Sequence, residues 1–254
     1  MNENVGVWKN IGDSTVWQTI RKSPIGIFIR SAYWHIHDDW DTATITLNGY
    51  TADFETPSPE SYMRVKRLAD EEEVLSDIVS ELQEGDVFLD VGANIGLYSV
   101  FAKSTGSKVI AAEPEPSNIE ILRRNLTKVN GESQILEQAL SDSNGTAHLE
   151  LSESDGCHSL SDDGIEIQTA RLDTLVESGG IPTPDVVKID VEGAESAVLE
   201  GATAVLNEVR AVYCEVHPNK MSGDNDIEDL LQTAGFEVDI VEETGDQYHV
   251  IGKR

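Results

Sequence analysis

The sequence is poor in cysteine, in basic residues and in long apolar runs. Its only cysteines, Cys157 and Cys214, have a spacing that matches neither a disulfide framework nor a cysteine-based zinc site. Lysine and arginine number 18 against 47 acidic residues, which argues against general nucleic-acid binding, because phosphate recognition needs clustered basic side chains. The apolar runs, such as residues 25–29, are too short to span a bilayer. No secretory signal pattern opens the chain, so the expected location is the cytoplasm.

The formal net charge of −29 predicts a dependence on salt. Such a surface repels itself, and salt screens the repulsion. This composition is typical of proteins from salt-loving archaea, although an ordinary acidic cytoplasmic protein is the alternative. We expect the midpoint of thermal unfolding to rise with KCl concentration. A parallel sucrose series is the control, because sucrose stabilises folded proteins without screening charge. Greatest stability and activity in dilute buffer would contradict this expectation.

The N-terminal segment differs from the rest of the chain. It holds all four tryptophans, Trp8, Trp17, Trp34 and Trp40, and its first 30 residues carry a local excess of basic side chains. One interpretation is a helix that packs its tryptophans on the main domain. The other is an interfacial segment within residues 1–40 that contacts a membrane surface or a lipid-linked substrate.

Residues 42–56 alternate apolar and polar side chains around an Asn-Gly pair, which predicts a β-hairpin. Just before it, His35 and His37 could share one side of a strand. A metal site is one interpretation of this pair, and an exposed polar strand face is the other. One or two helices should follow over residues 58–82. We therefore expect an N-terminal extension over residues 1–69 and a main domain over residues 70–254.

From residue 86 onward, predicted strands and helices alternate. The strands are indicated by residues 86–92, 108–114, 134–140, 184–193 and 210–218, and most of them precede a helical pattern, such as those over residues 116–130 and 194–208. Repeated βα units indicate an α/β fold with a mostly parallel sheet covered by helices on both faces. Residues 146–152 and 165–173 should add short antiparallel strands. Their polar loop, residues 152–164 with His158, should overhang the site. Residues 236–243 and 248–254 predict two final strands.

The stretch "FLDVGANIGLYS", residues 88–99, predicts a cofactor-binding turn between strand and helix. Its glycines allow close backbone approach, and the helix start offers N–H groups. No Gly-Lys-Ser/Thr follows, so it is not a Walker A loop, and the dinucleotide fingerprint lacks its middle glycine. Asp90 ends the strand. Its carboxylate would repel a pyrophosphate and suits a cationic cofactor such as S-adenosylmethionine.

Glu113 ends the next predicted strand, where an acid can accept hydrogen bonds from both hydroxyls of an adenosine ribose. NAD enzymes also use such an acid, so an NAD-dependent oxidoreductase is the alternative enzyme. A catalytically inactive protein of the same fold, serving as a partner subunit, is the non-enzyme alternative. Asp90 and Glu113 together favour S-adenosylmethionine.

Six motifs resemble the FkbM family of S-adenosylmethionine-dependent methyltransferases. They are "LDVGANIGLYS", "EPEPSN", "QALSD", "RLDTL", "KIDVEGAESAVLEGA" and "CEVHP", of which "KIDVEGAE" is the most specific. The resemblance covers roughly residues 70–245. It implies a Rossmann-like class I methyltransferase fold with a mostly parallel seven-stranded sheet. It also implies methyl transfer to a hydroxyl of a sugar, a glycan or a related metabolite.

By position, the resemblance assigns cofactor-binding residues. The turn is formed by Asp90, Gly92, Ala93, Asn94 and Gly96; Glu113 with Pro114 beside it binds the ribose, and Ala139 and Ser141 border the adenine.

The catalytic residues should follow the next two strand ends. Methyl transfer from a sulfonium mainly needs alignment of the acceptor, and a sugar hydroxyl gains from a general base. Asp190 and Glu192 end one strand, and Glu215 and His217 end a strand that should be its neighbour. Lys188 should lie in the strand interior, paired with an acid.

Three interpretations of these groups stay open. In the first, Asp190 borders cofactor and acceptor, and His217 or Glu192 is the base. In the second, all four acidic and histidine side chains form a divalent metal site. In the third, Glu192 caps the next helix and His217 bonds to a loop. We take Asp190, Glu192 and His217 as catalytic and assign no metal. A uronic-acid carboxylate is an alternative acceptor.

Overall fold

The structure is a computed structural model that describes residues 41–66, 68–151, 158–161, 164–219, 226–242 and 247–254. The tryptophan-rich segment, His35, His37, Cys157 and the side chain of His158 lie outside the described residues, as do the predictions made for them. Among the described residues, no helix has both the length and the apolar character needed to cross a bilayer.

A seven-stranded sheet forms the centre of the fold, in the order β12-β13-β11-β10-β3-β4-β5. The strands are β3 (Val87–Val91), β4 (Lys108–Ala112), β5 (Ser133–Leu136), β10 (Val186–Ile189), β11 (Ala211–Val216), β12 (Glu237–Glu242) and β13 (Tyr248–Lys253). All pairs are parallel except those that β13 makes with β11 and β12. The predicted mostly parallel sheet is confirmed. Strand order reverses between β3 and β10, which opens a crevice at their carboxyl ends.

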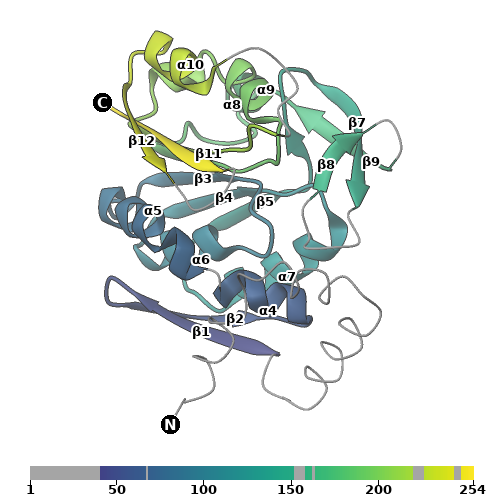
Figure 1. Ribbon diagram of the computed structural model, residues 1–254, viewed down its shortest axis with the longest axis vertical. Coiled ribbons are helices and arrows are strands. Elements are labelled where there is room, and N and C mark those ends of the chain that lie inside the picture. The colour runs from purple at the N-terminus through teal and green to yellow at the C-terminus, as the bar shows by residue number, and fades with distance from the viewer. Residues whose placement is uncertain (1–40, 67, 152–157, 162–163, 220–225, 243–246) are drawn as a thin grey trace, which may run out of the picture.

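Helices cover both faces of this sheet (Figure 1). One face carries α5 (Leu68–Glu81), α6 (Leu97–Ser104) and α7 (Pro116–Thr127), and the other carries α8 (Leu172–Glu177), α9 (Glu195–Glu200) and α10 (Ile227–Thr233). Strand β3 alternates between the two cores: Phe88 packs on the α6 side, and Leu89 and Val91 pack on the α9 side. The same alternation directs Asp90 towards α6.

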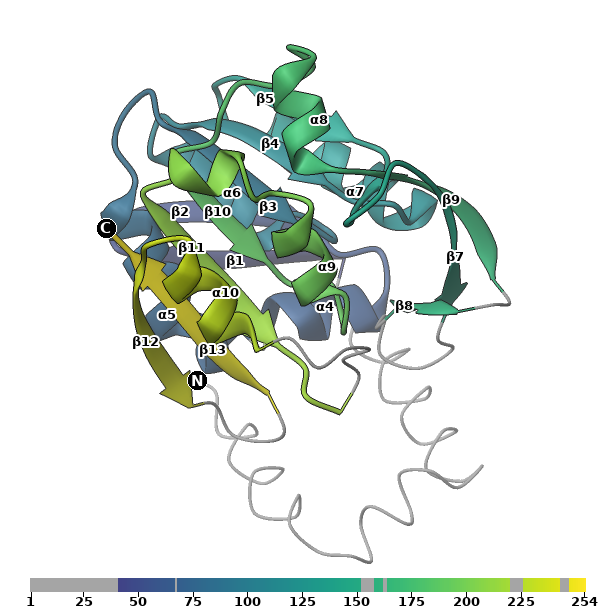
Figure 2. The same ribbon diagram turned by 90° about the horizontal axis from the view of Figure 1, so that it is seen from above.

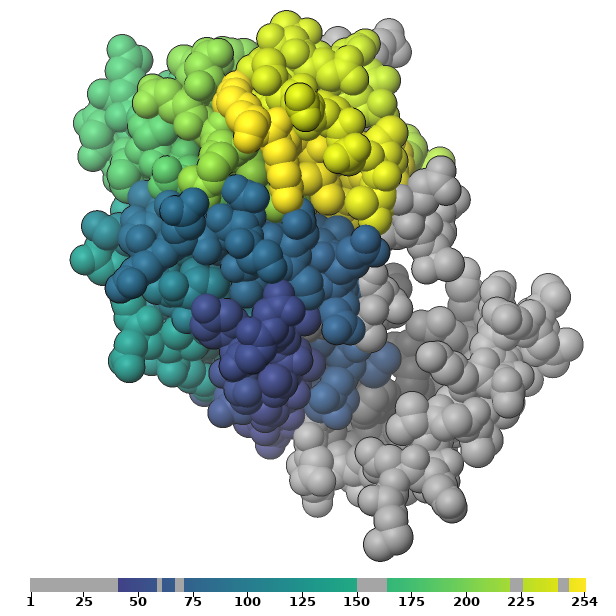
Figure 3. All heavy atoms as spheres, turned by 90° about the vertical axis from the view of Figure 1, so that its left-hand side faces the viewer, coloured from purple at the N-terminus to yellow at the C-terminus, as the bar shows by residue number. Residues whose placement is uncertain are grey.

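The predicted hairpin is confirmed as β1 (Thr42–Leu47) and β2 (Tyr50–Glu55). Asn48 and Gly49 both have positive φ, 48° and 84°, as a two-residue type I′ turn requires. Phe54 is fully buried against Phe101 of α6, with ring centroids 6.1 Å apart. The hairpin and α4 (Pro59–Lys66) therefore pack beside α5–α7, where the purple surface meets the blue in Figure 3. A domain boundary near residue 69 stays a prediction.

A second, four-stranded sheet lies to one side of the central one (Figures 1 and 2). It contains β6 (Ala139–Leu140), β7 (Gly145–Leu151), β8 (His158–Ser161) and β9 (Ile165–Ala170). Strand β7 pairs antiparallel with β9, as predicted. It also pairs antiparallel with β8, which lies within residues 152–164, where the sequence predicted only a loop. The single strand expected over residues 134–140 is wrong. The chain leaves the central sheet after Leu136, whose carbonyl accepts from the Glu113 N–H, and β6 joins β9 instead.

The long helix expected over residues 194–208 is also wrong, because α9 ends at Glu200 and a 3₁₀ turn follows at Val205–Asn207. A Cβ at Gly201 would lie 2.0 Å from the carbonyl oxygen of Ser141. The helix thus ends where its backbone packs directly on the loop that follows β6.

Candidate active site

Two positions of the turn after β3 require glycine because other protein atoms lie close to their Cα atoms. Gly92 and Gly96 have φ of 80° and 93°, which favours glycine. A Cβ at Gly92 would lie 1.8 Å from the carbonyl oxygen of Asp190, and one at Gly96 would lie 2.6 Å from Cδ1 of Leu122. The turn is therefore wedged between the end of β10 and α7.

The amides of this turn are satisfied within the protein. Gly92 and Ala93 N–H donate to the Ala112 carbonyl, Gly96 N–H to Ala93, Asn94 N–H to Glu113, and Ile95 N–H to the Asn94 side chain. The N–H groups of these five residues therefore bond within the protein, and the N–H groups expected at the helix start belong to α6, which begins at Leu97. A pyrophosphate-binding loop needs such groups turned outward, so the geometry disfavours a dinucleotide.

Asp90 lies beneath the turn rather than at its surface. Its side chain is fully buried, and Oδ2 accepts a 2.6 Å hydrogen bond from the Ser99 hydroxyl of α6. Burial raises the pKa of Asp90, although Lys188 and Ser99 oppose this effect. Oδ1 has no hydrogen-bond partner among the described residues. A buried carboxylate oxygen without a donor is costly, so this atom suits a cationic or hydrogen-bonding ligand.

Glu113 ties the turn to the start of α7. Oε2 accepts from the Asn94 N–H at 2.7 Å, and Oε1 accepts from the Glu115 N–H at 2.9 Å and from Asn118 Nδ2 at 3.4 Å. Burial raises the pKa of Glu113, against the effect of these hydrogen bonds. A carboxylate has about four lone-pair sites, so Glu113 retains capacity for a further donor.

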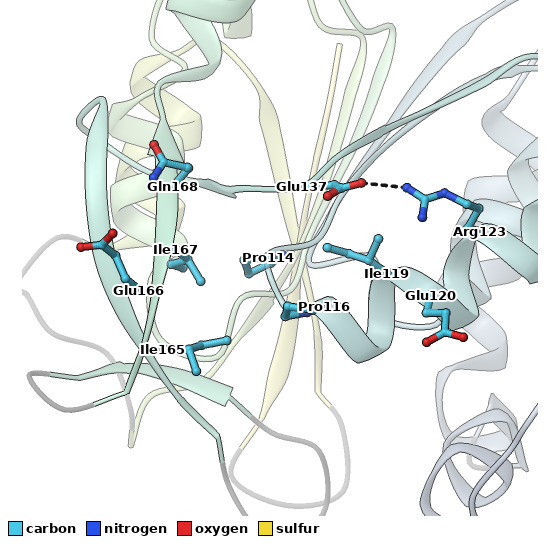
Figure 4. Close-up of a pocket in the computed structure, with 10 residues that line it drawn as sticks. All are labelled: Pro114, Pro116, Ile119, Glu120, Arg123, Glu137, Ile165, Glu166, Ile167 and Gln168. Carbon is cyan, nitrogen blue, oxygen red and sulfur yellow. Dashed lines mark hydrogen bonds and ion pairs between the residues drawn. The ribbon is translucent and has the colours of Figure 1, made fainter.

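The expected adenine-side residues differ in accessibility. Pro114 and Ala139 are half-buried, whereas Ser141 is buried and its N–H donates to the Ala170 carbonyl. A cleft of about 350 Å³ separates the start of α7 from β9. In Figure 4 its walls are Pro114, Pro116 and Ile119 on one side and Ile165 and Ile167 on the other, and an Arg123–Glu137 ion pair of 2.7 Å lies beside it. Of the predicted cofactor residues, only Pro114 lines this cleft.

The four groups predicted at the next two strand ends do converge. His217 Nε2 lies 3.5 Å from Glu192 Oε2, 3.7 Å from Glu215 Oε1 and 3.9 Å from Asp190 Oδ1. The convergence follows from the parallel pairing of β10 with β11, which brings their carboxyl ends to one edge of the sheet. One ligand atom each from Asp190, Glu192 and His217 lies within 4.8 Å of the others, a spacing that a divalent cation could also use.

Lys188 forms an ion pair with Asp190 and favours the ionised form of its carboxyl group. The Lys188 ammonium lies 2.9 Å from Asp190 Oδ2, and its side chain is only 3% exposed, which confirms the predicted pairing with an acid. Burial alone would raise the pKa of Asp190, but Lys188 and His217 hold it below its ordinary value. Tyr98 packs its ring 4.5 Å from the ammonium and donates its hydroxyl to Glu71 of α5 at 2.7 Å.

Glu192 does not cap the following helix. Helix α9 begins at Glu195 with Ala194 as its N-cap and no side-chain capping bond, so the capping interpretation is wrong. Glu192 instead has a left-handed φ of 56°, which is costly for a residue with a Cβ and is typical of functional sites.

Sequence reasoning missed Glu195, the residue in closest contact with His217. Its Oε1 lies 2.7 Å from His217 Nδ1, and its side chain is fully buried. The available signal was an acid inside "KIDVEGAE", the most specific of the motifs. By sequence alone, this acid is only one residue of the helix predicted over residues 194–208.

Three features define a class I methyltransferase, an enzyme that uses S-adenosylmethionine. They are the strand order of the central sheet, the acids Asp90 and Glu113 at the ends of two neighbouring strands, and a turn over residues 92–96 whose N–H groups bond within the protein. Residues 90–238 match the methyltransferase FkbM domain. The chain belongs to the FkbM methyltransferase family.

Three proteins of named function are similar in sequence to this chain. The chain is 37% identical over 211 residues to the hexuronic acid methyltransferase AglP of Haloferax volcanii, covering 82% of this chain and 87% of the relative. It is 32% identical to the 31-O-demethyl-FK506 methyltransferase FkbM of Streptomyces tacrolimicus, over 54% of this chain and 67% of the relative. It is 30% identical to the 2-O-methyltransferase NoeI of Sinorhizobium fredii, over 54% of this chain and 66% of the relative.

Proposed function

We propose that this protein transfers the methyl group of S-adenosylmethionine to an oxygen atom of a sugar, with a hexuronic acid of a glycan as the acceptor class. The observation that carries the proposal is that His217 lies close to Asp190 and Glu192, beside the turn that follows Asp90. The relatives named for methyl transfer to a hexuronic acid and to 2-O and 31-O positions support an oxygen acceptor.

The predicted cofactor residues fit this donor. When bound, S-adenosylmethionine supplies an electrophilic methyl group on a sulfonium. Asp90, with its unpartnered Oδ1, and Glu113, with its remaining lone-pair capacity, favour a cationic, hydroxyl-bearing ligand over a phosphate. The other residues assigned to this role are Gly92, Ala93, Asn94, Gly96, Pro114, Ala139 and Ser141.

In the proposed mechanism His217 Nε2 accepts the proton of the acceptor hydroxyl. Burial acts to lower the pKa of His217, but its hydrogen bond to Glu195 and the charges of Asp190 and Glu192 raise the pKa above its usual value. The neutral imidazole, which is the form able to accept a proton, therefore becomes dominant only at higher pH.

A uronate carboxylate is the second candidate acceptor, favoured by the name of the Haloferax volcanii relative. It is already anionic at neutral pH and needs no base. It would, however, approach Asp190, Glu192 and Glu215, which repel it. Mild alkali distinguishes the products, because it cleaves a methyl ester and leaves a methyl ether intact.

Replacing Glu113 with alanine should raise the Kd for S-adenosylhomocysteine about 10- to 100-fold, since one or two charge-assisted hydrogen bonds are lost. Calorimetric titration in molar KCl measures the change. Glu132→Ala is the matched control, because this acid is 76% exposed and pairs only with surface Lys108 among the described residues. Binding of NAD in place of S-adenosylhomocysteine, or of neither, would contradict the proposed function.

A further inference from the structure

The imidazole of His217 is held from two sides. Nε2 faces the crevice carboxylates of Asp190, Glu192 and Glu215, and Nδ1 faces away from them. The side chain is only 3% exposed. Its Nδ1 lies 2.7 Å from Oε1 of Glu195, a distance typical of a charge-assisted hydrogen bond.

Glu195 is placed to control this ring. It stands at the first residue of α9, and its Oε1 also accepts the Gly193 N–H at 3.0 Å. The carboxylate is fully buried, so water does not compete for this contact. Because Oε1 already accepts from the Gly193 N–H, this oxygen acts as an acceptor, and the hydrogen of its contact with the ring is assigned to Nδ1.

We propose that Glu195 is a positioning residue that fixes His217 as the Nδ1–H tautomer, so that Nε2 carries the lone pair which takes the proton from the acceptor hydroxyl. The inference rests on the proposed function and deepens it. Among the described residues, no other carboxylate is found within hydrogen-bonding distance of Nδ1.

The proton balance follows from this geometry. The hydroxyl hydrogen moves to Nε2, the acceptor oxygen forms its bond to the methyl carbon, and the electron pair of the breaking carbon–sulfur bond stays on sulfur. The ring is then a cation with a hydrogen on each nitrogen. Glu195 stabilises this cation through Nδ1–H until Nε2 returns its proton to solvent.

The carboxylates that face the ring come from three elements. Asp190 and Glu192 follow β10, Glu195 belongs to α9, and Glu215 belongs to β11. Lys188 neutralises part of this charge through Asp190, and His249 of β13 lies 4.0 Å from Glu215. Glu195 is thus one of several groups that raise the pKa of His217, and it is the one that bonds to the ring.

The direct test is nitrogen-15 NMR of labelled histidine in the wild-type protein and in Glu195→Gln. We expect wild-type His217 to be the Nδ1–H tautomer once deprotonated. In Glu195→Gln its titration should move to lower pH and the single tautomer should be lost. With a hexuronic-acid-terminated oligosaccharide, kcat should fall about 10- to 100-fold, with the pH midpoint of kcat moved in the same direction.

Two variants give the comparison. Glu192→Gln also removes a charge beside the ring, but from the Nε2 side, and should lower the midpoint while keeping the Nδ1–H tautomer. Glu200→Gln changes the same residue type at the far end of α9 and should leave both quantities unchanged. Should Glu195→Gln fail to fold, the wild-type tautomer decides alone: an Nε2–H ring overturns the proposal.

Failure of this inference is distinguishable from failure of the proposed function. Normal S-adenosylhomocysteine binding with an unchanged His217 titration in Glu195→Gln overturns the role of Glu195 only. Absence of S-adenosylhomocysteine binding to the wild type overturns the proposed function. Loss of wild-type activity with a chelator, restored by Mn²⁺ that also broadens the His217 signals, would make the cluster a metal site and overturn the base.

Discussion

Replacing Lys188 with methionine should lower the free energy of unfolding by about 3–5 kcal/mol near neutral pH, because it leaves buried carboxylates without their cation. Lys188 is 3% exposed and bonds to Asp190 at 2.9 Å. Its charge also acts on Asp90, Glu215 and Glu71. Methionine preserves most of the volume above the Tyr98 ring, so the loss reports charge rather than packing. Urea denaturation measures it.

The control is the same substitution at the surface. Lys253 pairs with Asp77 at 2.6 Å and lies 5.6 Å from the Tyr213 ring, but its side chain is 38% exposed. Lys253→Met should therefore cost about 1 kcal/mol or less. Equal losses for the two variants would show that burial does not control the strength of the Lys188 pair.

The Lys188→Met loss should depend on pH. The pKa of Asp190 is depressed in the folded protein, so its pairing contributes stability above the ordinary carboxyl pKa of about 4, and this is lost as pH falls through the folded pKa. Without Lys188 the buried acids accept protons more readily. The difference between variant and wild type should therefore shrink in acid, and a gap that widens there would contradict the account.

The parts of the fold that the sequence predicted correctly depend on short-range patterns. Asn48-Gly49 alone determines the hairpin turn, since both residues must adopt positive φ. Alternating βα units determine the parallel sheet. The convergence of Asp190 with His217 needed only that β10 and β11 be neighbours, which the crossover between them makes probable.

The parts that could not be predicted depend on contacts between distant segments. Gly92 is indispensable because the Asp190 carbonyl approaches it, and Gly201 because Ser141 does. Neither contact leaves a local pattern. Glycine spacing alone therefore predicts a tight turn but not which protein atoms approach it.

Asp90 and Glu195 show the same limit for charged residues. Each was visible as an acid next to a strand or helix end, but no local rule says how deeply such a side chain is buried. Asp90 lies under the turn because β3 alternation aims it at Ser99, and Glu195 lies against His217 because α9 packs beside β11. The chemistry of the site depends on the directions in which the side chains of Asp90 and Glu195 point.

Replacing His217 with glutamine should lower kcat about 10²- to 10⁴-fold, the usual contribution of a general base, with little change in the Kd for S-adenosylhomocysteine. His148→Gln is the control, because His148 is exposed and is not among the residues that line the cleft. Radiolabel transfer to a hexuronic-acid-terminated oligosaccharide gives the rates.

The pH profile makes this prediction specific for a hydroxyl acceptor. Wild-type kcat should rise as pH passes through the raised pKa of His217, whereas the variant should lack this step. Over the same window the stability that the protonated ring contributes, complete below about pH 6.5, is lost as pH rises through the folded pKa. The enzyme thus gains activity while losing part of its stability.

A carboxylate acceptor needs no base, so near-normal kcat in His217→Gln together with an alkali-labile product would assign the methyl to the uronate carboxyl instead.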